Sequence, residues 1–209
     1  GIHETRGTTT TIKDMTIEGC DARGNGGGVS SPAETLTLTN VTISDCRAVS
    51  NISGSECFGG GVYCTNAVKT LTLDNCRITG NTASGRKTSR GGGVYPYNAN
   101  VTMIDTGIEN NVLGVTGTAY DAAGMYMASG RKLTLGDGTE ESDTSFIRGN
   151  TLQSGTASNL RLSMTGNNDS VNRADSVLVN CGGLSGTIYV VNARNAGTQF
   201  GTTGKKDKA

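Results

Sequence analysis

The sequence predicts an all-β parallel β-helix, a solenoid in which each coil contributes three strands. The first observation is a glycine motif that returns every thirty-odd residues, as Gly26-Gly27-Gly28-Val29-Ser30, Gly59-Gly60-Gly61-Val62-Tyr63-Cys64, Gly91-Gly92-Gly93-Val94-Tyr95 and Ala122-Ala123-Gly124-Met125-Tyr126. Self-similarity at such a period is typical of repeat architectures. The second observation is the composition: the 209 residues include 32 glycines, 34% are hydrophobic and 4% are aromatic. These proportions suit a thin core of Val, Ile, Leu and Thr strands with glycine at the corners.

Each coil is predicted to contain three short strands in a fixed order. The glycine motif begins the first strand, Leu71-Thr72-Leu73 is an example of the second, and Cys76-Arg77-Ile78-Thr79-Gly80-Asn81 contains the third. Strand alternation places Leu71 and Leu73 on one face and Thr72 on the other. The segments are too short and too rich in Thr, Val and Gly to be helices.

The spacing of the second strand indicates how the coils stack. Its matching positions are separated by 26, 35, 30 and 32 residues, at Ile12, Leu38, Leu73, Met103 and Leu135. A constant pattern with a varying period indicates loops of different length at a fixed place. Because no coil can bury its aliphatic face alone, we expect like strands to stack at about 4.8 Å in one column.

The repeats define the expected domain organisation. We expect a single domain over residues 1–201, with regular coils over about 10–150 and irregular coils over 151–201. An acidic insertion at 137–143 interrupts the fifth coil, and Val177-Leu178-Val179 and Ile188-Tyr189-Val190-Val191 supply the last strands. Residues 202–209 are predicted to be a disordered tail.

The glycine motif and the pattern Ile78-x-x-Asn81 resemble the GGA-I and F-x-x-N repeats of chlamydial polymorphic outer-membrane proteins. More broadly, the chain is similar to right-handed parallel β-helix surface proteins of the pectin-lyase-like superfamily, over roughly residues 10–150. It departs from the chlamydial repeats at Ile78, Ile108 and Ile147, where they have Phe, and in having Gly for Ala. The resemblance implies a right-handed solenoid and a bacterial secreted or cell-surface location. It implies little about function, because β-helices include lyases, hydrolases, adhesins and phage tail spikes.

A column of tyrosines is the first candidate site. If Val62 and its counterparts point inward, then Tyr63, Tyr95 and Tyr126 point outward and stack coil on coil, with Arg161 continuing the column. Flat amphipathic rings in a row suit the binding of sugars. Stacked side chains of one type also stabilise a sheet without any ligand.

Loops at one corner adjoin this column. The longer connections fall at 47–58, 82–90, 112–121 and 151–158, between the third strand and the next glycine motif. Loops on one edge of a rigid solenoid are a common binding site. Arg86, Lys87 and Arg90 make one loop basic, which indicates either a binding surface or an ordinary solvated loop.

Two further columns carry polar or sulfur-containing residues. One contains Asp14, Asn40, Asn75, Asp105 and Asp137, which suit turn hydrogen bonding and could also offer oxygens to calcium. The other contains Cys20, Cys46, Asn81, Asn111 and Asn150, predicted to point inward. Cys20 and Cys46 lie one coil apart, at a spacing that fits either a disulfide or two packed thiols.

The remaining features restrict the function. The net charge of +0 gives no basic surface for nucleic acid, and no apolar run is long enough to span a membrane. The cysteines show no metal-binding spacing and the one histidine is His3, so no metal or cofactor is predicted.

The leading hypothesis is a non-catalytic, adhesin-like segment that binds a glycan or a host ligand. A carbohydrate-active enzyme ranks second, with Asp74 and Asp105 as the nearest approach to a catalytic pair. A structural spacer is the third hypothesis. The oligomeric state, the ligand and the host organism do not follow from the sequence.

Overall fold

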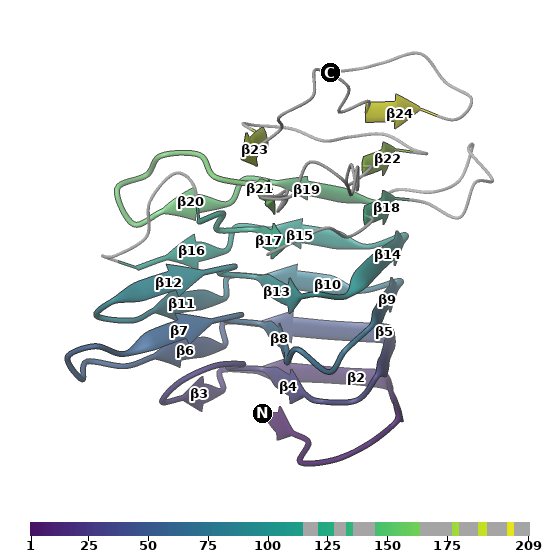
Figure 1. Ribbon diagram of the computed structural model, residues 1–209, viewed down its shortest axis with the longest axis horizontal. Helices are drawn as coiled ribbons and strands as arrows, with labels where there is room; N and C mark the ends of the chain where they lie inside the picture. The colour runs from purple at the N-terminus through teal and green to yellow at the C-terminus, as the bar shows by residue number, and fades with distance from the viewer. Residues whose placement is uncertain are drawn as a thin grey trace, which may run out of the picture.

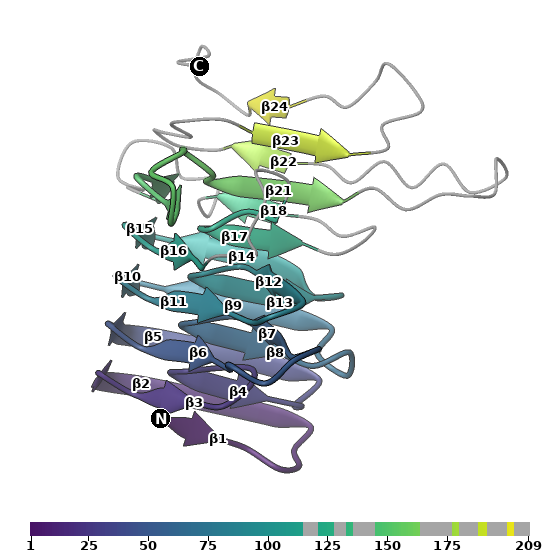
Figure 2. The same cartoon turned by 90° about the vertical axis from the view of Figure 1, so that its left-hand side faces the viewer.

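The chain winds into stacked coils that rise from the N-terminus to the C-terminus (Figure 1). The computed structural model describes residues 1–114, 121–127, 133–135 and 145–163, together with three short strands at 177–179, 188–191 and 200–202. The described residues form strands and turns only, and every pair of neighbouring strands is parallel. Figures 1 and 2 together show that the coils turn in the right-handed sense. The predicted parallel β-helix is therefore confirmed.

The glycine motifs precede the strands of a seven-stranded sheet, called sheet A here. Its strands, in spatial order, are β1 (Ile2–His3), β4 (Val29–Ser31), β8 (Val62–Cys64), β13 (Val94–Tyr97), β17 (Met125–Met127), β21 (Leu160–Ser163) and β23 (Ile188–Val191). A Cβ atom on Gly60 would lie 2.3 Å from the carbonyl oxygen of Gly92 and 2.5 Å from that of Thr82. Glycine is thus required there because neighbouring backbones approach too closely for any side chain.

The predicted second and third strands belong to one ten-stranded sheet, sheet B. It consists of β2 (Thr9–Glu18), β5 (Thr35–Ser44), β9 (Thr70–Asp74), β10 (Arg77–Thr79), β14 (Asn100–Ile104), β15 (Gly107–Glu109), β18 (Leu133–Leu135), β19 (Phe146–Arg148), β22 (Val177–Val179) and β24 (Phe200–Thr202). The register pairs Ile12 with Leu38, Leu38 with Leu73, Leu73 with Met103, and Met103 with Leu135. The column predicted from the spacing is confirmed.

The corner predicted to be loops contains strands of its own. Sheet C consists of β3 (Asp21–Ala22), β6 (Arg47–Val49), β11 (Thr82–Ser84), β16 (Val112–Leu113) and β20 (Thr151–Leu152), and a further pair consists of β7 (Glu56–Phe58) and β12 (Thr88–Arg90). Ala83, Leu113 and Leu152 point inward and form a small second core. Two or three residues per coil are enough to extend the sheet, so the coils have a third wall rather than an irregular corner.

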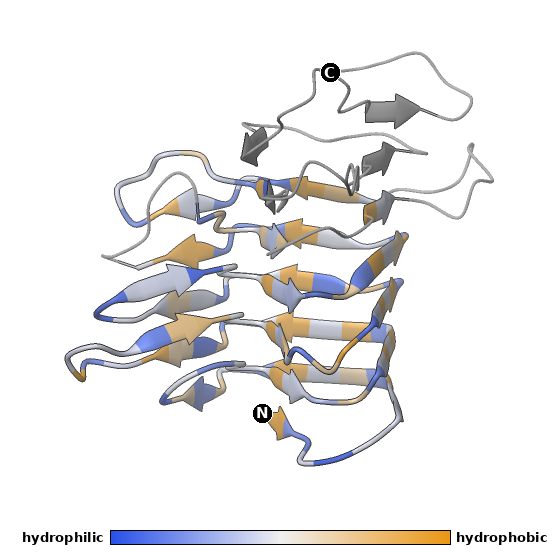
Figure 3. Cartoon of the chain, viewed as in Figure 1, coloured by the Kyte–Doolittle hydropathy of each residue, from blue (hydrophilic) through white to orange (hydrophobic). Residues whose placement is uncertain are grey.

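The main core fills the space between sheets A and B with one aliphatic layer per coil. Val62, Val94 and Met125 face Ile43, Ile78 and Ile108 in the same cluster, and all six are 0% exposed. Figure 3 shows the alternation of apolar and polar residues along β2 and β5 that places one face inside.

Asparagines replace aliphatic residues at one inner position, and we call Asn81, Asn111 and Asn150 the inner ladder. Each is 0% exposed. Asn111 Oδ1 accepts the backbone N–H of Asn81 at 2.9 Å, and its Nδ2 donates to the carbonyl of Ile78 at 2.9 Å. Asn150 repeats this pattern toward Asn111, and Asn159 continues it toward Asn150. The ladder satisfies backbone groups that bend away from the sheets.

The cysteines and the C-terminal coils complete the description. Cys20, Cys46, Cys57, Cys64 and Cys76 are free thiols.

Strands are present at both predicted C-terminal segments, in β22 and β23. Of the predicted tail only Thr202 is described, as the end of β24. The insertion at 137–143 and residues 203–209 lie outside the described residues.

Candidate ligand-binding groove

The tyrosine column stacks but is covered. The ring centroids of Tyr63 and Tyr95 are 5.9 Å apart, and those of Tyr95 and Tyr126 are 5.5 Å apart, with interplanar angles of 12° and 21°. Tyr95 is only 2% exposed and Tyr126 only 4%. Burial raises the pKa of Tyr95 well above its ordinary value. The expected exposed row of rings is therefore corrected: two of its three members are inaccessible to a sugar.

The cover comes from Phe58 and Arg90 at the neighbouring corner and from Arg161 on β21, which follows Tyr126 in the column. Phe58 on β7 stacks on Tyr95 at 4.8 Å, and the guanidinium carbons of Arg90 and Arg161 lie 5.0 and 4.8 Å from the ring centroid of Tyr126. Both arginines also pair with the carboxylate of Asp121, at 3.3 and 3.7 Å. Cation–π contacts and paired charges of this kind stabilise a satellite core. Arg90 and Arg161 thus belong to a packed aromatic cluster.

The three basic side chains of the loop at 82–90 do not form one exposed cluster. Arg86 is exposed at the tip between β11 and β12, where its backbone N–H donates to Ser55 Oγ at 3.1 Å. Lys87 Nζ lies 3.0 Å from Glu56 Oε1. Because Arg90 turns into the aromatic cluster, the loop presents Arg86 and Lys87 without it.

The outer Asx column forms a second ladder, which we call the outer ladder. Its described members are Asp14, Asn40, Asn75 and Asp105, with φ angles of 54°, 54°, 49° and 45°. Asn40 Nδ2 donates to Asp14 Oδ1 at 2.9 Å, and Asn75 Nδ2 donates to Asn40 Oδ1 at 2.7 Å. Asn and Asp tolerate this left-handed conformation better than other residues with a Cβ atom. The column therefore forms the sharp corner between the two arms of sheet B. Asp137, its fifth predicted member, lies outside the described residues.

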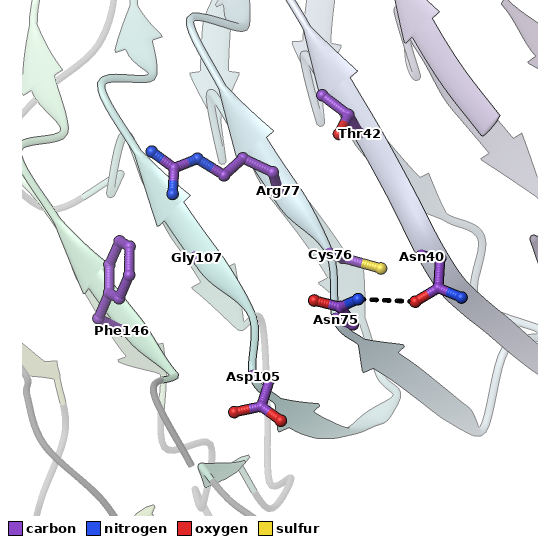
Figure 4. A pocket seen from close by; sticks show the side chains of 8 residues that line it. All are labelled: Asn40, Thr42, Asn75, Cys76, Arg77, Asp105, Gly107 and Phe146. Atoms are coloured by element: carbon purple, nitrogen blue, oxygen red, sulfur yellow. Dashed lines mark hydrogen bonds between the residues drawn. The ribbon is translucent and has the colours of Figure 1, made fainter. Parts of the chain in front are cut away.

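A groove opens beside the outer ladder, on the outer face of sheet B (Figure 4). Its lining residues are Asn40, Thr42, Asn75, Cys76, Arg77, Asp105, Gly107 and Phe146. The register places Gly107 between Arg77 on β10 and Phe146 on β19. A Cβ atom on Gly107 would lie 2.6 Å from Phe146 Cζ, so the aromatic ring leans over the glycine. The missing side chain leaves room for both neighbours and lowers the floor of the groove.

Charged groups hold the walls of the groove in place. Arg77 and Arg148 both pair with Glu109, the latter at 3.4 Å between Nε and Oε2. The Glu109 side chain is only 8% exposed, so this carboxylate is largely shielded by the two arginines. The guanidinium carbon of Arg148 lies 4.0 Å from the ring centroid of Phe146. The aromatic wall and the cationic wall are therefore linked through one buried carboxylate.

The two candidate catalytic carboxylates do not face each other across adjacent coils. Asp74 pairs in register with Ile104, and Asp105 is the residue that follows Ile104. Asp105 lines the groove, whereas Asp74 does not. Within the described residues, no group of three His, Cys, Asp or Glu side chains is arranged to hold a metal ion.

Sequence reasoning missed Phe146, Arg77 and Asn75 as parts of one site. A signal was present: Arg77, Gly107 and Phe146 occupy the same position of the third strand in successive coils. A glycine between two large side chains in such a column indicates an opening on the surface. The repeat aligns these positions, but it does not indicate which outward side chains enclose a groove.

The comparisons with known proteins add no relative. No family model, curated protein or solved structure matches this chain. Among the described residues, no helix has the length and apolar character needed to cross a bilayer.

Proposed function

We propose that this chain is a non-catalytic, adhesin-like segment of a bacterial secreted or cell-surface protein, and that the groove on sheet B binds a glycan. The observation that carries the proposal is the placement of an aromatic ring, a guanidinium and exposed amides around a glycine floor. The likeness of the repeats to chlamydial outer-membrane repeats and to pectin-lyase-like surface proteins supports the location.

The chemistry of the groove suits a sugar. A sugar ring offers a C–H face that packs on an aromatic ring, and hydroxyl groups that both donate and accept hydrogen bonds. Phe146 is half-buried and supplies the ring, while Arg77 supplies N–H donors. Asn75 donates one amide hydrogen to Asn40, which leaves its second hydrogen and its Oδ1 for a ligand.

The rigidity of the walls also supports binding. The lining residues lie on four parallel strands and on the hydrogen-bonded outer ladder, so little conformational freedom is lost when a ligand binds. A shallow site of this kind suits the weak, repeated contacts of an adhesin better than the enclosure of a small cofactor.

A glycan array tests the proposal directly. The wild-type chain is expected to bind one class of glycan, and Phe146→Ala is expected to weaken that binding roughly tenfold, or about 1.4 kcal/mol. Thr72→Ala is the matched control, because Thr72 points outward from the same sheet but does not line the groove. Tyr63→Ala tests the tyrosine column and is expected to leave binding unchanged.

The possible results separate the hypotheses. Loss of binding in Tyr63→Ala but not in Phe146→Ala would move the site to the aromatic cluster. Absence of binding to every glycan would favour the structural spacer.

A polysaccharide lyase or glycoside hydrolase is the second candidate, and the position of Asp105 in the groove favours it. A hydrolase uses a pair of carboxylates and a lyase uses a base that removes a proton. Asp105→Asn removes the charge but keeps a residue that already occupies the same turn at Asn75. Turnover of pectin, alginate or a glycosaminoglycan, measured with and without divalent metal and lost in Asp105→Asn, would replace the binding hypothesis with this one.

A further inference from the structure

The first two coils contain a pair of cysteines in register. Glu18 pairs with Ser44 and Asp21 pairs with Arg47, so the two residues between these pairs in each coil also lie side by side. The backbone confirms the alignment on both sides of the cysteines. Gly19 N–H donates to the carbonyl of Ser44 at 3.0 Å, and Arg47 N–H donates to the carbonyl of Cys20 at 2.7 Å. Cys20 is therefore the direct neighbour of Cys46.

The spacing of this pair fits a covalent bond. Neighbouring parallel strands are about 4.8 Å apart, within the range of Cα separations that disulfides span. The Cys46 Sγ atom lies 3.3 Å from the carbonyl oxygen of Ser44, and the Cys20 Sγ atom lies 3.4 Å from that of Glu18. Each thiol thus contacts the carbonyl two residues before it, so the two side chains leave their strands in the same direction.

The pair takes the place of the inner ladder at this end of the solenoid. Cys46 N–H donates to Asn81 Oδ1 at 2.9 Å, the bond that each inner asparagine also makes toward the next coil. Cys46 has no amide with which to continue the column toward the first coil. Its thiol contacts the carbonyl of Ile17 at 3.6 Å, where Asn81 Nδ2 donates to the carbonyl of Ile43 at 3.0 Å in the next coil. At this position the first coil is therefore joined to the second by a weaker sulfur contact than the amide hydrogen bonds of the later coils.

We propose that Cys20 and Cys46 form a disulfide that fastens the first coil to the second. The bond adds a covalent link at a position where the inner ladder has only a weak sulfur contact. Burial raises the pKa of Cys46 to about 11, whereas Cys20 is partly exposed. Cys20 is thus the thiol that a small oxidant reaches first, and Cys46 is the resolving thiol.

The oxidant in this reaction is a low-molecular-weight disulfide such as oxidised glutathione. The Cys20 thiolate attacks one sulfur of that disulfide, forms a mixed disulfide and releases one small thiolate. The Cys46 thiolate then attacks Cys20 Sγ, and the second small thiol leaves. The two protein thiols lose two electrons and two protons, and the small disulfide becomes two thiols.

The other described cysteines lack such a partner. Cys57 pairs in register with Ser89, and Cys64 pairs with Ser31. The N–H of Cys76 donates to Thr106 Oγ1, which occupies the corresponding position in the next coil. These three thiols are expected to stay reduced, and Cys181 lies outside the described residues.

Thiol mapping of the full chain tests the proposal. The reduced protein is equilibrated with oxidised glutathione, trapped with an alkylating agent in denaturant, digested and analysed by mass spectrometry. We expect a linked peptide pair containing Cys20 and Cys46, and full alkylation of Cys57, Cys64 and Cys76. The control Cys76→Ser should leave the linked pair unchanged. In Cys46→Ser no second thiol can displace glutathione, so the reaction should end with a glutathione adduct on Cys20.

Limited proteolysis tests the claim that the bond fastens the first coil. Trypsin cleavage after Lys13 and Arg23 should be several-fold slower in the oxidised protein, and reductant should restore the faster rate. A wild-type protein that keeps glutathione on Cys20, leaves Cys20 free or links it to a second molecule would overturn the proposal. Equal cleavage rates in both redox states would overturn the claim of fastening.

Discussion

Two columns of amide and carboxylate side chains run along the same coils, one inside the solenoid and one outside. The inner ladder is 0% exposed, and its amides bond to one another and to buried backbone groups of the coils. The outer ladder is exposed, and the amides of Asn40 and Asn75 each donate to a side-chain oxygen of the preceding coil, at a corner where φ is positive. The same residue type thus serves the fold where water is excluded, and can serve a ligand where water is present.

The largest expected effect is on the inner ladder. Asn111→Ala removes the acceptor for the Asn81 N–H and the donor to the Ile78 carbonyl. Each buried polar group left without a partner costs about 1–3 kcal/mol, so the free energy of unfolding should fall by roughly 3–5 kcal/mol. Chemical denaturation at neutral pH measures the change. A loss below about 1 kcal/mol would mean that water replaces the amide inside the coil.

The interior also imposes a pH dependence. Burial raises the pKa of Cys64 from 9.0 to about 12. Because the folded state holds this proton more tightly than the unfolded state, the stabilisation is complete below pH 9 and is lost as the pH rises toward 12. The free energy of unfolding should fall by about 2–3 kcal/mol between pH 8 and pH 11 from this group alone.

Denaturation midpoints measured in reductant across that pH range test the effect. Cys64→Ala is less stable at pH 8 because of the cavity, but its stability should fall less steeply with pH than that of the wild type. Parallel curves for the two proteins would show that Cys64 ionises without unfolding the chain.

The outer ladder should respond to backbone conformation rather than to lost hydrogen bonds. Asn75 has a φ of 49°, a conformation that costs a residue with an ordinary Cβ atom about 1–2 kcal/mol. Asn75→Ala should therefore destabilise the fold by about 1 kcal/mol, whereas Asn75→Gly should change it by less than about 0.5 kcal/mol. Equal losses in both variants would show that the amide itself matters for stability, as it does inside.

The smallest effect is expected for an ion pair on the exterior. Lys69 Nζ lies 2.8 Å from Glu34 Oε1, but the two side chains are 71% and 53% exposed. Exposed pairs contribute about 0–1 kcal/mol, so Lys69→Ala should lower the free energy of unfolding by no more than about 0.5 kcal/mol. A larger loss, persisting in high salt, would point to packing by the lysine stem.

The parts of the fold that were predictable are those that repeat. Leu38, Leu73 and Met103 could be aligned because each coil has the same alternation of apolar and polar residues. Stacking follows from the need to bury the apolar face. The strands at the corner were missed because β6, β11 and β16 have only two or three residues each, too few for a period to be visible. The inner ladder was predicted, but its continuation at Asn159 was not, since Asn159 follows Asn150 by only nine residues.

The candidate site was predictable only in part. The sequence correctly indicated stacking of Tyr63, Tyr95 and Tyr126, because neighbours in one column must stack. It could not indicate that Phe58 and Arg90 would cover them, since both come from a segment that lacks the repeat pattern. The groove beside Phe146 was not predicted because the apolar repeat does not specify how the outward side chains of Arg77, Gly107 and Phe146 pack in their column.

The sequence by itself determined the architecture of this protein. Apolar alternation and glycine spacing recur in every coil, and stacking parallel coils is the arrangement that buries the aliphatic face of each one. Only the tertiary structure decided which outward side chains meet water. That outcome depends on how non-repeating segments fold back over the coils. Contacts of such segments produce no periodic pattern in the sequence, so the sequence does not predict them.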